Sequence, residues 1–198
     1  MKIILASQSP SRKKLLSKIG LKFEVFATNI DEEKLLDPKK PADSCYAIAK
    51  QKALTAKIKY PKDLIITCDQ MAYLNGKLFG KAHTEKKAIE NLVQLQGKTH
   101  TLISALYMSW AKKDGFHISK SHLSMRPLSL KQITDYVRKE QPLKSAGSYH
   151  VESIGLTLFE KIKTEDFNSI EGLPLIKLVN QLKKWNYPLW NNIYQTLP

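Results

Sequence analysis

The segment LIITCDQMAYLNGKLFG, residues 64–80, contains the features that decide the fold. It opens with an apolar, partly β-branched run, which predicts a buried strand that ends at the carboxylate of Asp69. Asn75-Gly76 lies between MAYL and KLFG, and this dipeptide is the strongest short-range signal for a hairpin. A hairpin directly after a buried strand interrupts the alternation expected of a simple series of βαβ units.

The neighbouring segments extend this sheet. KTHTLISALYMSW and FHISKSHLSM, residues 98–110 and 116–125, predict two long adjacent strands, with Asp114-Gly115 as the turn into the second. Shorter strands are predicted by residues 1–5, 21–28 and 155–162.

Helices are predicted between the strands. Residues 41–59 have helical spacing, with an apolar face of Ala47, Ile48, Leu54 and Ile58. Other helices begin after Thr84, after a capping box formed by Ser129 and Gln132, and at residue 172 near the end of the chain. We expect the aromatic residues 187–198 to pack on the body of the protein. The sequence therefore predicts one α/β domain over residues 1–198, with a mixed twisted sheet of long antiparallel strands flanked by helices.

The loop ASQSPSRKKLL, residues 6–16, leaves the first strand and begins a helix. Ser9 is a suitable N-cap, and Pro10 suits the first helical position. Free backbone N–H groups, the hydroxyl groups of Ser7 and Ser9, and the cations Arg12 and Lys13 then meet at one helix end, which favours a phosphate. The simpler interpretation is an ordinary capped helix with its lysines in water.

Composition narrows the class of protein. The 198 residues are 42% hydrophobic and 25% charged, and no apolar run approaches the roughly 20 residues that span a bilayer. We expect no membrane partner and a cytoplasmic location, because there is no signal-peptide pattern. The lone Cys45 and Cys68 argue against a disulfide scaffold and a structural zinc.

The net charge of +14 suggests polyanionic partners. The only arginines are Arg12, Arg126 and Arg138, and because arginine is the preferred residue for recognising DNA, this argues against a sequence-specific DNA-binding protein. No common nucleotide-binding or metal-binding motif is complete in the sequence. Charged residues lie at the ends of several expected elements: Glu32, Asp69 and Lys81 follow strands or the hairpin, and Glu152 precedes the last strand. A divalent ion held by carboxylates and substrate phosphates would explain acidic residues beside a basic loop, whereas solvated surface charges are the plainer alternative.

Taken in order, these segments resemble the Maf family of nucleoside triphosphate pyrophosphatases. The resemblance begins at ASQSPSRKKLL and continues through FEVFATNIDEE, AIAKQKA, LIITCDQMAYLNGKLFGKA, GKTHT, YVRKEQPLKSAGSYHVESIGLTLFEKI and FNSIEGLPLIKL. It implies a Maf/ITPase-like architecture and the hydrolysis of a nucleoside triphosphate, either 7-methyl-GTP or another modified nucleotide, to a monophosphate and pyrophosphate in a housecleaning role. It also implies a divalent cation, Mg²⁺ or alternatively Mn²⁺ or Co²⁺, and a homodimer.

The resemblance assigns roles to single residues. Asp69 would accept a proton from the attacking water and also contact the metal, which Glu32 would support. Lys52 and Lys81 would neutralise charge on phosphoryl oxygens. The triphosphate would be held by Ser7, Ser9, Arg12 and Lys13.

Within the family, Gln70 and Glu152 resemble the branch that acts on 7-methyl-GTP, whereas the branch that acts on dTTP and UTP tends to have threonine and glutamine there. Ser11 stands where the first branch often has tryptophan, so a stacking platform for a cationic base is missing at that position. Ala82 and Ser104-Ala105 also replace residues usual in the family. A dTTP/UTP pyrophosphatase is the closer alternative, and a basic, non-catalytic nucleic-acid-binding protein is the alternative of another class.

Overall fold

The computed structural model describes residues 1–194, which are built around one seven-stranded mixed sheet. The strand order is β2-β1-β3-β5-β6-β7, and β4 pairs with β3 outside this path. β1 pairs in parallel with β2 and β3, and the other pairs are antiparallel. The strands are β1 (Ile3–Leu5), β2 (Glu24–Val25), β3 (Leu64–Leu74), β4 (Lys77–Phe79), β5 (Thr99–Trp110), β6 (Lys113–Met125) and β7 (Phe159–Lys163). The predicted mixed α/β fold with long antiparallel strands is confirmed.

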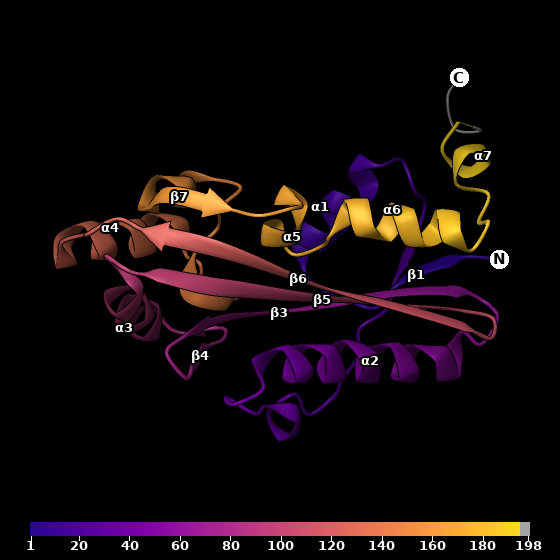
Figure 1. Cartoon of the computed structure of the whole chain (residues 1–198), viewed down its shortest axis with the longest axis horizontal. Helices are drawn as coiled ribbons and strands as arrows, with labels where there is room; N and C mark the ends of the chain where they lie inside the picture. Colours follow the sequence, from indigo (N-terminus) through magenta and orange to yellow (C-terminus); the bar gives the residue numbers. More distant parts are fainter. Residues whose placement is uncertain (195–198) are drawn as a thin grey trace.

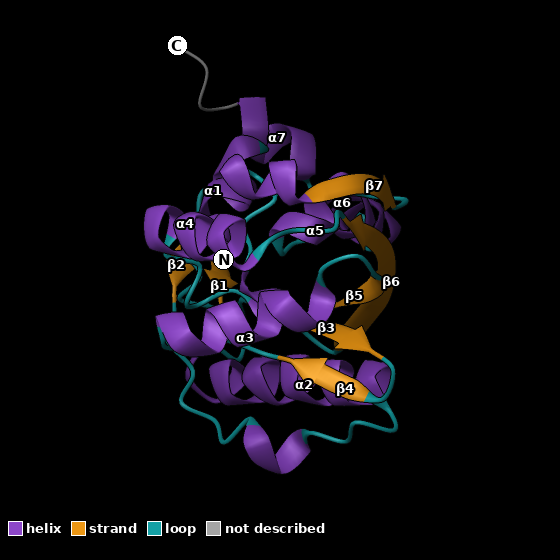
Figure 2. Cartoon of the chain, turned by 90° about the vertical axis from the view of Figure 1, so that its left-hand side faces the viewer, coloured by secondary structure: helices purple, strands orange, loops and turns teal. Residues whose placement is uncertain are grey.

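Helices cover the sheet on both faces. They are α1 (Pro10–Lys18), α2 (Pro41–Lys59), α3 (Glu85–Leu95), α4 (Leu130–Glu140), α5 (Phe167–Glu171), α6 (Leu175–Lys184) and α7 (Leu189–Tyr194). Short 3₁₀ turns are η1 (Glu33–Leu35), η2 (Ala146–Ser148) and η3 (Ile154–Leu158). Figure 1 shows α2 along one face of the long strands and α1, α5 and α6 along the other. Figure 2 shows the curvature of the sheet between these layers.

Three predicted helix starts are correct, whereas the helix predicted from residue 172 begins at Leu175, because Gly172 ends α5 and Pro174 precedes α6. Ser9 and Thr84 accept hydrogen bonds from the first turns of α1 and α3, and Ser129 with Gln132 forms the capping box of α4. In the C-terminal segment, Tyr187 and Leu189 are buried in the hydrophobic core cluster that also contains Leu178 of α6, as expected for packing on the body of the protein. Residues 195–198 of that segment lie outside the described residues.

Of the four residues in the predicted apolar face of α2, only Ile48 is buried in the structure. Leu54 and Ile58 are 44% and 85% exposed. The face that packs on the sheet instead contains Cys45, Ala49, Ala53 and Ala56. These small side chains allow the helix to lie close to the sheet, so the larger apolar residues face outward.

Two strand predictions need correction. β3 does not end at Asp69 but continues to Leu74, because β5 pairs with it without interruption and places Ala105 opposite Asp69. Residues 21–28, predicted as a strand, contain only the two-residue strand β2.

The turn between the long strands also differs from the prediction. Asp114-Gly115 lies inside β6, and the chain turns at Ala111-Lys112 because Trp110 pairs with Lys113. Ala111 takes the left-handed conformation that a two-residue hairpin loop requires, with φ of 53°. Likewise, β7 begins only at Phe159, since the preceding residues form η3.

One edge of β3 is interrupted. β1 pairs with this strand as far as Ile66, whereas β4 pairs with it only from Ala72. β5 occupies the opposite edge throughout. Residues 67–71 of β3 therefore have no strand beside them on this edge, and Asp69 lies in the middle of that gap.

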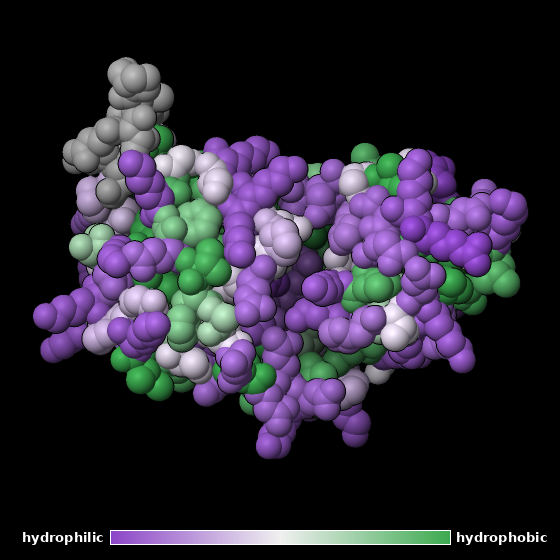
Figure 3. Space-filling model, turned by 180° about the vertical axis from the view of Figure 1, so that it is seen from behind, coloured by the Kyte–Doolittle hydropathy of each residue, from purple (hydrophilic) through white to green (hydrophobic). Residues whose placement is uncertain are grey.

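The outer surface is largely polar. Figure 3 shows hydrophilic side chains over most of the face opposite to that of Figure 1, and this face is hollowed near its middle. Among the described residues, no helix combines the length and the apolar character needed to cross a membrane.

Candidate active site

Four parts of the chain meet at the gap in the sheet. The loop containing Ser7 follows β1, the segment containing Lys81 follows β4, and Asp69 projects from β3 between them. Lys52 reaches the same place from the middle of α2. The interruption of one strand edge thus brings together residues that are distant in sequence.

The N-terminus of α1 presents polar groups as predicted. Ser9 caps the helix, and its own N–H donates to Ser7 Oγ at 3.2 Å. The guanidinium group of Arg12 donates to Ser7 Oγ at 3.2 Å and to the carbonyl oxygen of Gly172 at 3.0 Å. Arg12 is thereby fixed between α1 and the end of α5. Within the described residues, no hydrogen bond or ion pair holds the side chain of Lys13, which leaves its ammonium group available.

A charged cluster occupies the gap itself. The ammonium group of Lys52 lies 2.8 Å from Asp69 Oδ1 and 2.8 Å from Glu32 Oε1. The second oxygen of Glu32 lies 3.9 Å from the ammonium group of Lys81, which is about half exposed. Lys52 and Asp69 are each 6% exposed. The structure therefore brings the four residues of the predicted catalytic and metal-binding sets into one continuous chain of charges.

The charges stabilise each other. Burial lowers the pKa of Lys52, but attraction to Asp69 and hydrogen bonds to Asp69 and Glu32 outweigh it, so the pKa lies above its usual value. Burial raises the pKa of Glu32, but its contacts with Lys52 outweigh this, and the net shift is downward. The positive charge of Arg12 lowers the pKa of both groups, which places Arg12 within electrostatic reach of the cluster.

Cys45 was not among the predicted site residues, yet it contacts the cluster. Its thiol lies 3.9 Å from Asp69 Oδ2 and 3.7 Å from the carbonyl oxygen of Ile103. Burial, and next the charge of Asp69, raise the pKa of this thiol well above its usual value, so it stays protonated and can donate to Asp69. The seven-residue spacing of Cys45 and Lys52 in a helix could have revealed this contact, since it places both on one face.

The three predicted specificity residues do not form one group of contacts. Ser11 Oγ donates to Glu152 Oε1 at 2.9 Å, so these two meet beside the start of α1. The amide of Gln70 instead donates to the carbonyl oxygens of Ser169 and Ile170, each at 2.9 Å, and to Ser104 Oγ at 3.1 Å. Gln70 points to the face of β3 opposite to Asp69 and fastens α5 to the sheet.

The donor groups are suited to a hard divalent cation. Among the described residues, no three His, Cys, Asp or Glu side chains are arranged so that together they could hold a metal ion. Mg²⁺, however, is commonly held by one or two carboxylates together with substrate phosphates and water. Glu32 and Asp69, which share the Lys52 ammonium group, fit this smaller requirement.

A buried carboxylate in contact with Lys52, near a capped helix N-terminus that carries Arg12, is suited to a protein that binds and attacks phosphorylated compounds. Comparison with known proteins then identifies the family. Residues 2–185 match the model of the Maf family, described as "Maf-like protein". The chain belongs to the Maf family.

Curated relatives match almost the full length. A 7-methyl-GTP pyrophosphatase of Bdellovibrio bacteriovorus is 38% identical over 185 residues, which cover 93% of this chain and 97% of the relative. A dTTP/UTP pyrophosphatase of Aquifex aeolicus is 34% identical over 186 residues, which cover 94% of this chain and 96% of the relative. Among solved structures, the crystal structure of protein VC0702 from Vibrio cholerae is similar, with 17% sequence identity and a TM-score of 0.43. The match covers 94% of this chain and 98% of the VC0702 chain.

Proposed function

We propose that this Maf-family protein hydrolyses a nucleoside triphosphate to the nucleoside monophosphate and pyrophosphate. It is a nucleotide pyrophosphatase, a hydrolase that acts on an acid anhydride. The observation that carries the proposal is the contact of the buried Asp69 with Lys52 in the gap of the sheet, beside the phosphate-binding features of α1. The family membership supports the same activity.

The residues have distinct roles in this reaction. The α1 N-terminus, Ser7, Ser9, Arg12 and Lys13 hold the triphosphate. Asp69 accepts a proton from water while the water oxygen attacks the α-phosphorus. The bond between the α-phosphorus and the bridging oxygen breaks, and pyrophosphate leaves with the electron pair. Lys52 and Lys81 stabilise the negative charge that develops on the phosphoryl oxygens.

A divalent cation, most simply Mg²⁺, would be held by Glu32 and Asp69. When bound, such an ion neutralises phosphate charge and polarises the phosphoryl group. Lys52 contacts the same two carboxylates.

The preferred substrate that we propose is 7-methyl-GTP. Glu152 is a hydrogen-bond acceptor beside the start of α1, and a carboxylate can accept from the donors of guanine and suits the positive charge of a methylated ring. Several of the similar curated proteins carry this activity in their names. A dTTP/UTP pyrophosphatase is the alternative, supported by the Aquifex aeolicus relative and by the serine at position 11.

A non-catalytic nucleic-acid-binding protein has less support. Such a protein needs cations on its surface, but it does not need a buried carboxylate that contacts both Lys52 and Cys45 of α2. We further propose that the protein acts in the cytoplasm as a homodimer, on the strength of the family resemblance. Analytical ultracentrifugation tests the dimer, and a monomer at micromolar concentration would contradict it.

The activity is tested by measuring pyrophosphate release from GTP, 7-methyl-GTP, dTTP, UTP, CTP and ITP, with Mg²⁺ and with EDTA. We expect metal-dependent release, fastest with 7-methyl-GTP. Faster release from dTTP or UTP would keep the enzyme class and overturn the proposed substrate. No release from any triphosphate would overturn the proposed activity.

A further inference from the structure

A cavity of about 440 Å³ lies on the α2 face of the sheet, beside the N-terminus of that helix. Its lining comes from the start of α2 and from β3, β5 and β6, and includes none of the residues assigned to the reaction above. Met71 is buried and lies between Asp69 and Tyr73 on the same face of β3. The cavity is therefore separate from the gap that contains Asp69.

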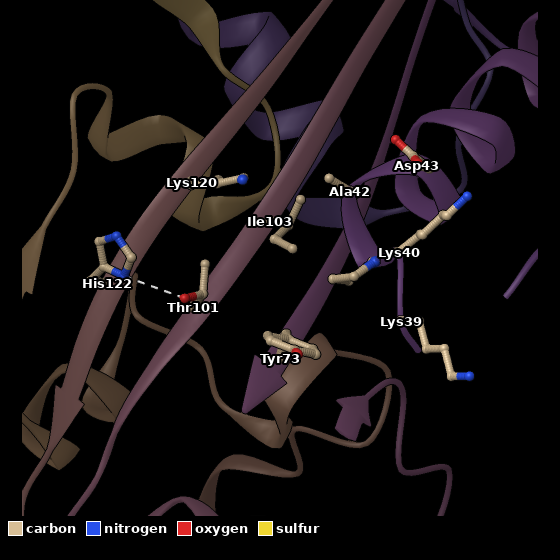
Figure 4. Close-up of a pocket in the computed structure, with 10 residues that line it drawn as sticks. Lys39, Lys40, Ala42, Asp43, Tyr73, Thr101, Ile103, Lys120 and His122 are labelled. Atoms are coloured by element: carbon tan, nitrogen blue, oxygen red, sulfur yellow. Dashed lines mark hydrogen bonds between the residues drawn. The ribbon is translucent and has the colours of Figure 1, made fainter. Parts of the chain in front are cut away.

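The floor of this cavity is apolar and partly aromatic. It is formed by Tyr73 on β3, Ile103 on β5 and Ala42 in the first turn of α2. Figure 4 shows these side chains facing a common space, with the hydrogen bond of 3.3 Å between Thr101 Oγ1 and His122 Nδ1 at its side. An inorganic anion alone would leave the aromatic ring and the isoleucine in water, so the floor suits a flat, largely apolar group.

The walls of the cavity are cationic. Lys120 extends from β6 toward α2, and Lys39 and Lys40 lie at the rim with their ammonium groups turned outward (Figure 4). The flexible stems of these two lysines allow them to turn toward a bound anion. Lys40 precedes α2 without giving its first turn a side-chain hydrogen bond. Backbone N–H groups at this helix end thus add a partial positive charge.

One acidic side chain, that of Asp43, also belongs to the lining. In Figure 4 its carboxylate lies on the α2 side of the cavity, across from Lys120, so it does not neutralise the Lys120 ammonium group. The volume lies within the range of about 300–1,000 Å³ that is usual for small-molecule sites.

We propose that this cavity is a second binding site, for a free nucleoside 5′-phosphate. The base stacks on Tyr73 and contacts Ile103, and the phosphate is bound by Lys120 with Lys39, Lys40 and the first turn of α2. This combination of an aromatic platform with neighbouring cations is the chemistry by which proteins hold single nucleotides. The proposal does not depend on hydrolysis at Asp69.

Photo-cross-linking locates the site directly. The intact protein is irradiated with 8-azidoadenosine 5′-monophosphate in EDTA, and the labelled peptides are mapped by mass spectrometry. We expect label on peptides that contain Tyr73, residues 39–43 or residues 119–122. Label confined to peptides that contain Ser7, Arg12 or Glu152 would overturn the proposal, because the nucleotide would then occupy only the catalytic site.

Variants test the contribution of individual groups. We expect Lys120→Glu to weaken the labelling of the second site about tenfold, because it replaces a charge-assisted contact by repulsion. Tyr73→Leu should weaken it through loss of stacking. Lys86→Glu, an equal change of charge on α3 and outside the lining, is the control and should label like the wild type. Wild-type labelling of Lys120→Glu would overturn the proposal.

Two further measurements distinguish this site from the catalytic site and from a surface that binds nucleic acid. Asp69→Asn should retain the label at the second site although it loses turnover, so failure of the proposed hydrolysis and failure of this proposal are distinguishable. Unlabelled AMP should compete with the label more strongly than a ten-residue thymidine oligonucleotide at equal concentration of phosphate groups. Stronger competition by the oligonucleotide would indicate a nucleic-acid surface and overturn the proposal of a free nucleotide.

Discussion

The ammonium group of Lys52 joins Asp69 to Glu32, at 2.8 Å from an oxygen of each carboxylate. One buried cation thereby holds in place the two acidic groups that we assign to the reaction. Because Lys52 comes from the middle of α2 and Asp69 from the unpaired edge of β3, this contact also fixes the helix relative to the gap.

Asp69→Asn should lower turnover by at least about 100-fold, because the amide cannot accept the proton of the attacking water. The fold should remain, since the amide has nearly the same shape and can still accept a hydrogen bond from Lys52. Pyrophosphate release and thermal unfolding measure the two effects. Asp135→Asn, on the exposed face of α4, is the control. Turnover at the wild-type rate would remove Asp69 from the mechanism.

Lys52→Met should lower the free energy of unfolding by about 3 kcal/mol, because removing one partner of a buried ion pair leaves the other uncompensated. Urea denaturation measures this change. Lys50→Met is a matched control on the exposed side of the same helix and should change the free energy of unfolding little. If both variants were equally stable, the Lys52 contact would not be important for the fold.

Gln70→Glu should destabilise the protein by about 2 kcal/mol or more, because an oxygen would replace the amide donor that faces two carbonyl oxygens of α5. Gln51→Glu, on the exposed side of α2, provides the comparison in urea denaturation. The alternative result is informative: unchanged stability together with altered preference among triphosphates would assign Gln70 to base recognition instead of to the packing of α5.

Ser11→Trp should raise the preference for 7-methyl-GTP over GTP by about threefold, because an indole ring attracts a cationic base by about 0.7 kcal/mol at a partly exposed position. The ratio of kcat/KM for the two triphosphates measures this. Ser11→Ala, which removes the hydrogen bond to Glu152 without adding a ring, is the control. An unchanged ratio in Ser11→Trp would show that the base does not lie beside α1.

His100 makes stability depend on pH. Burial lowers its pKa from 6.5 to about 4. Between these values the unfolded chain binds a proton that the folded chain does not, so the free energy of unfolding should fall as the pH falls. The full contribution is about 3 kcal/mol.

Urea denaturation at several pH values between 4 and 7 tests this expectation. The difference in stability between wild type and His100→Gln should shrink as the pH falls, because glutamine does not titrate and can still bond to the hydroxyl group of Tyr149. His122→Gln, at an exposed position on β6, is the control. A difference that stays constant with pH would mean that His100 is protonated equally in both states.

The layers of the fold could be predicted because local patterns agree with the final structure. The hairpin at Asn75-Gly76 and the caps at Ser9, Thr84 and Ser129 depend on residues close in sequence, and all four are present. The turn at Asp114-Gly115 was wrong for the opposite reason. A strong local turn pair was overridden by the register between β5 and β6, which places Asp114 opposite Ser109.

The site could be predicted only in part. The cap and cations of α1 follow from local sequence, but the contact of Lys52 with Asp69 joins two elements, and only the family resemblance suggested a shared role. Asp69 was expected at the end of a strand because a charged residue follows an apolar run. In the structure it is tolerated inside the strand, since Lys52 and Cys45 supply its partners. Such long-range compensation has no local signature.

The gap in the edge of β3 has a consequence for access to Asp69. β1 ends its pairing at Ile66 and β4 begins at Ala72, so neither strand covers the edge beside this carboxylate. Because β4 runs antiparallel to β3, the chain turns back toward the gap after Phe79, and Lys81 reaches Glu32 there. A longer β1 or an earlier start of β4 would fill this edge with backbone, so the shortness of these two strands is what leaves room for a phosphate chain beside Asp69.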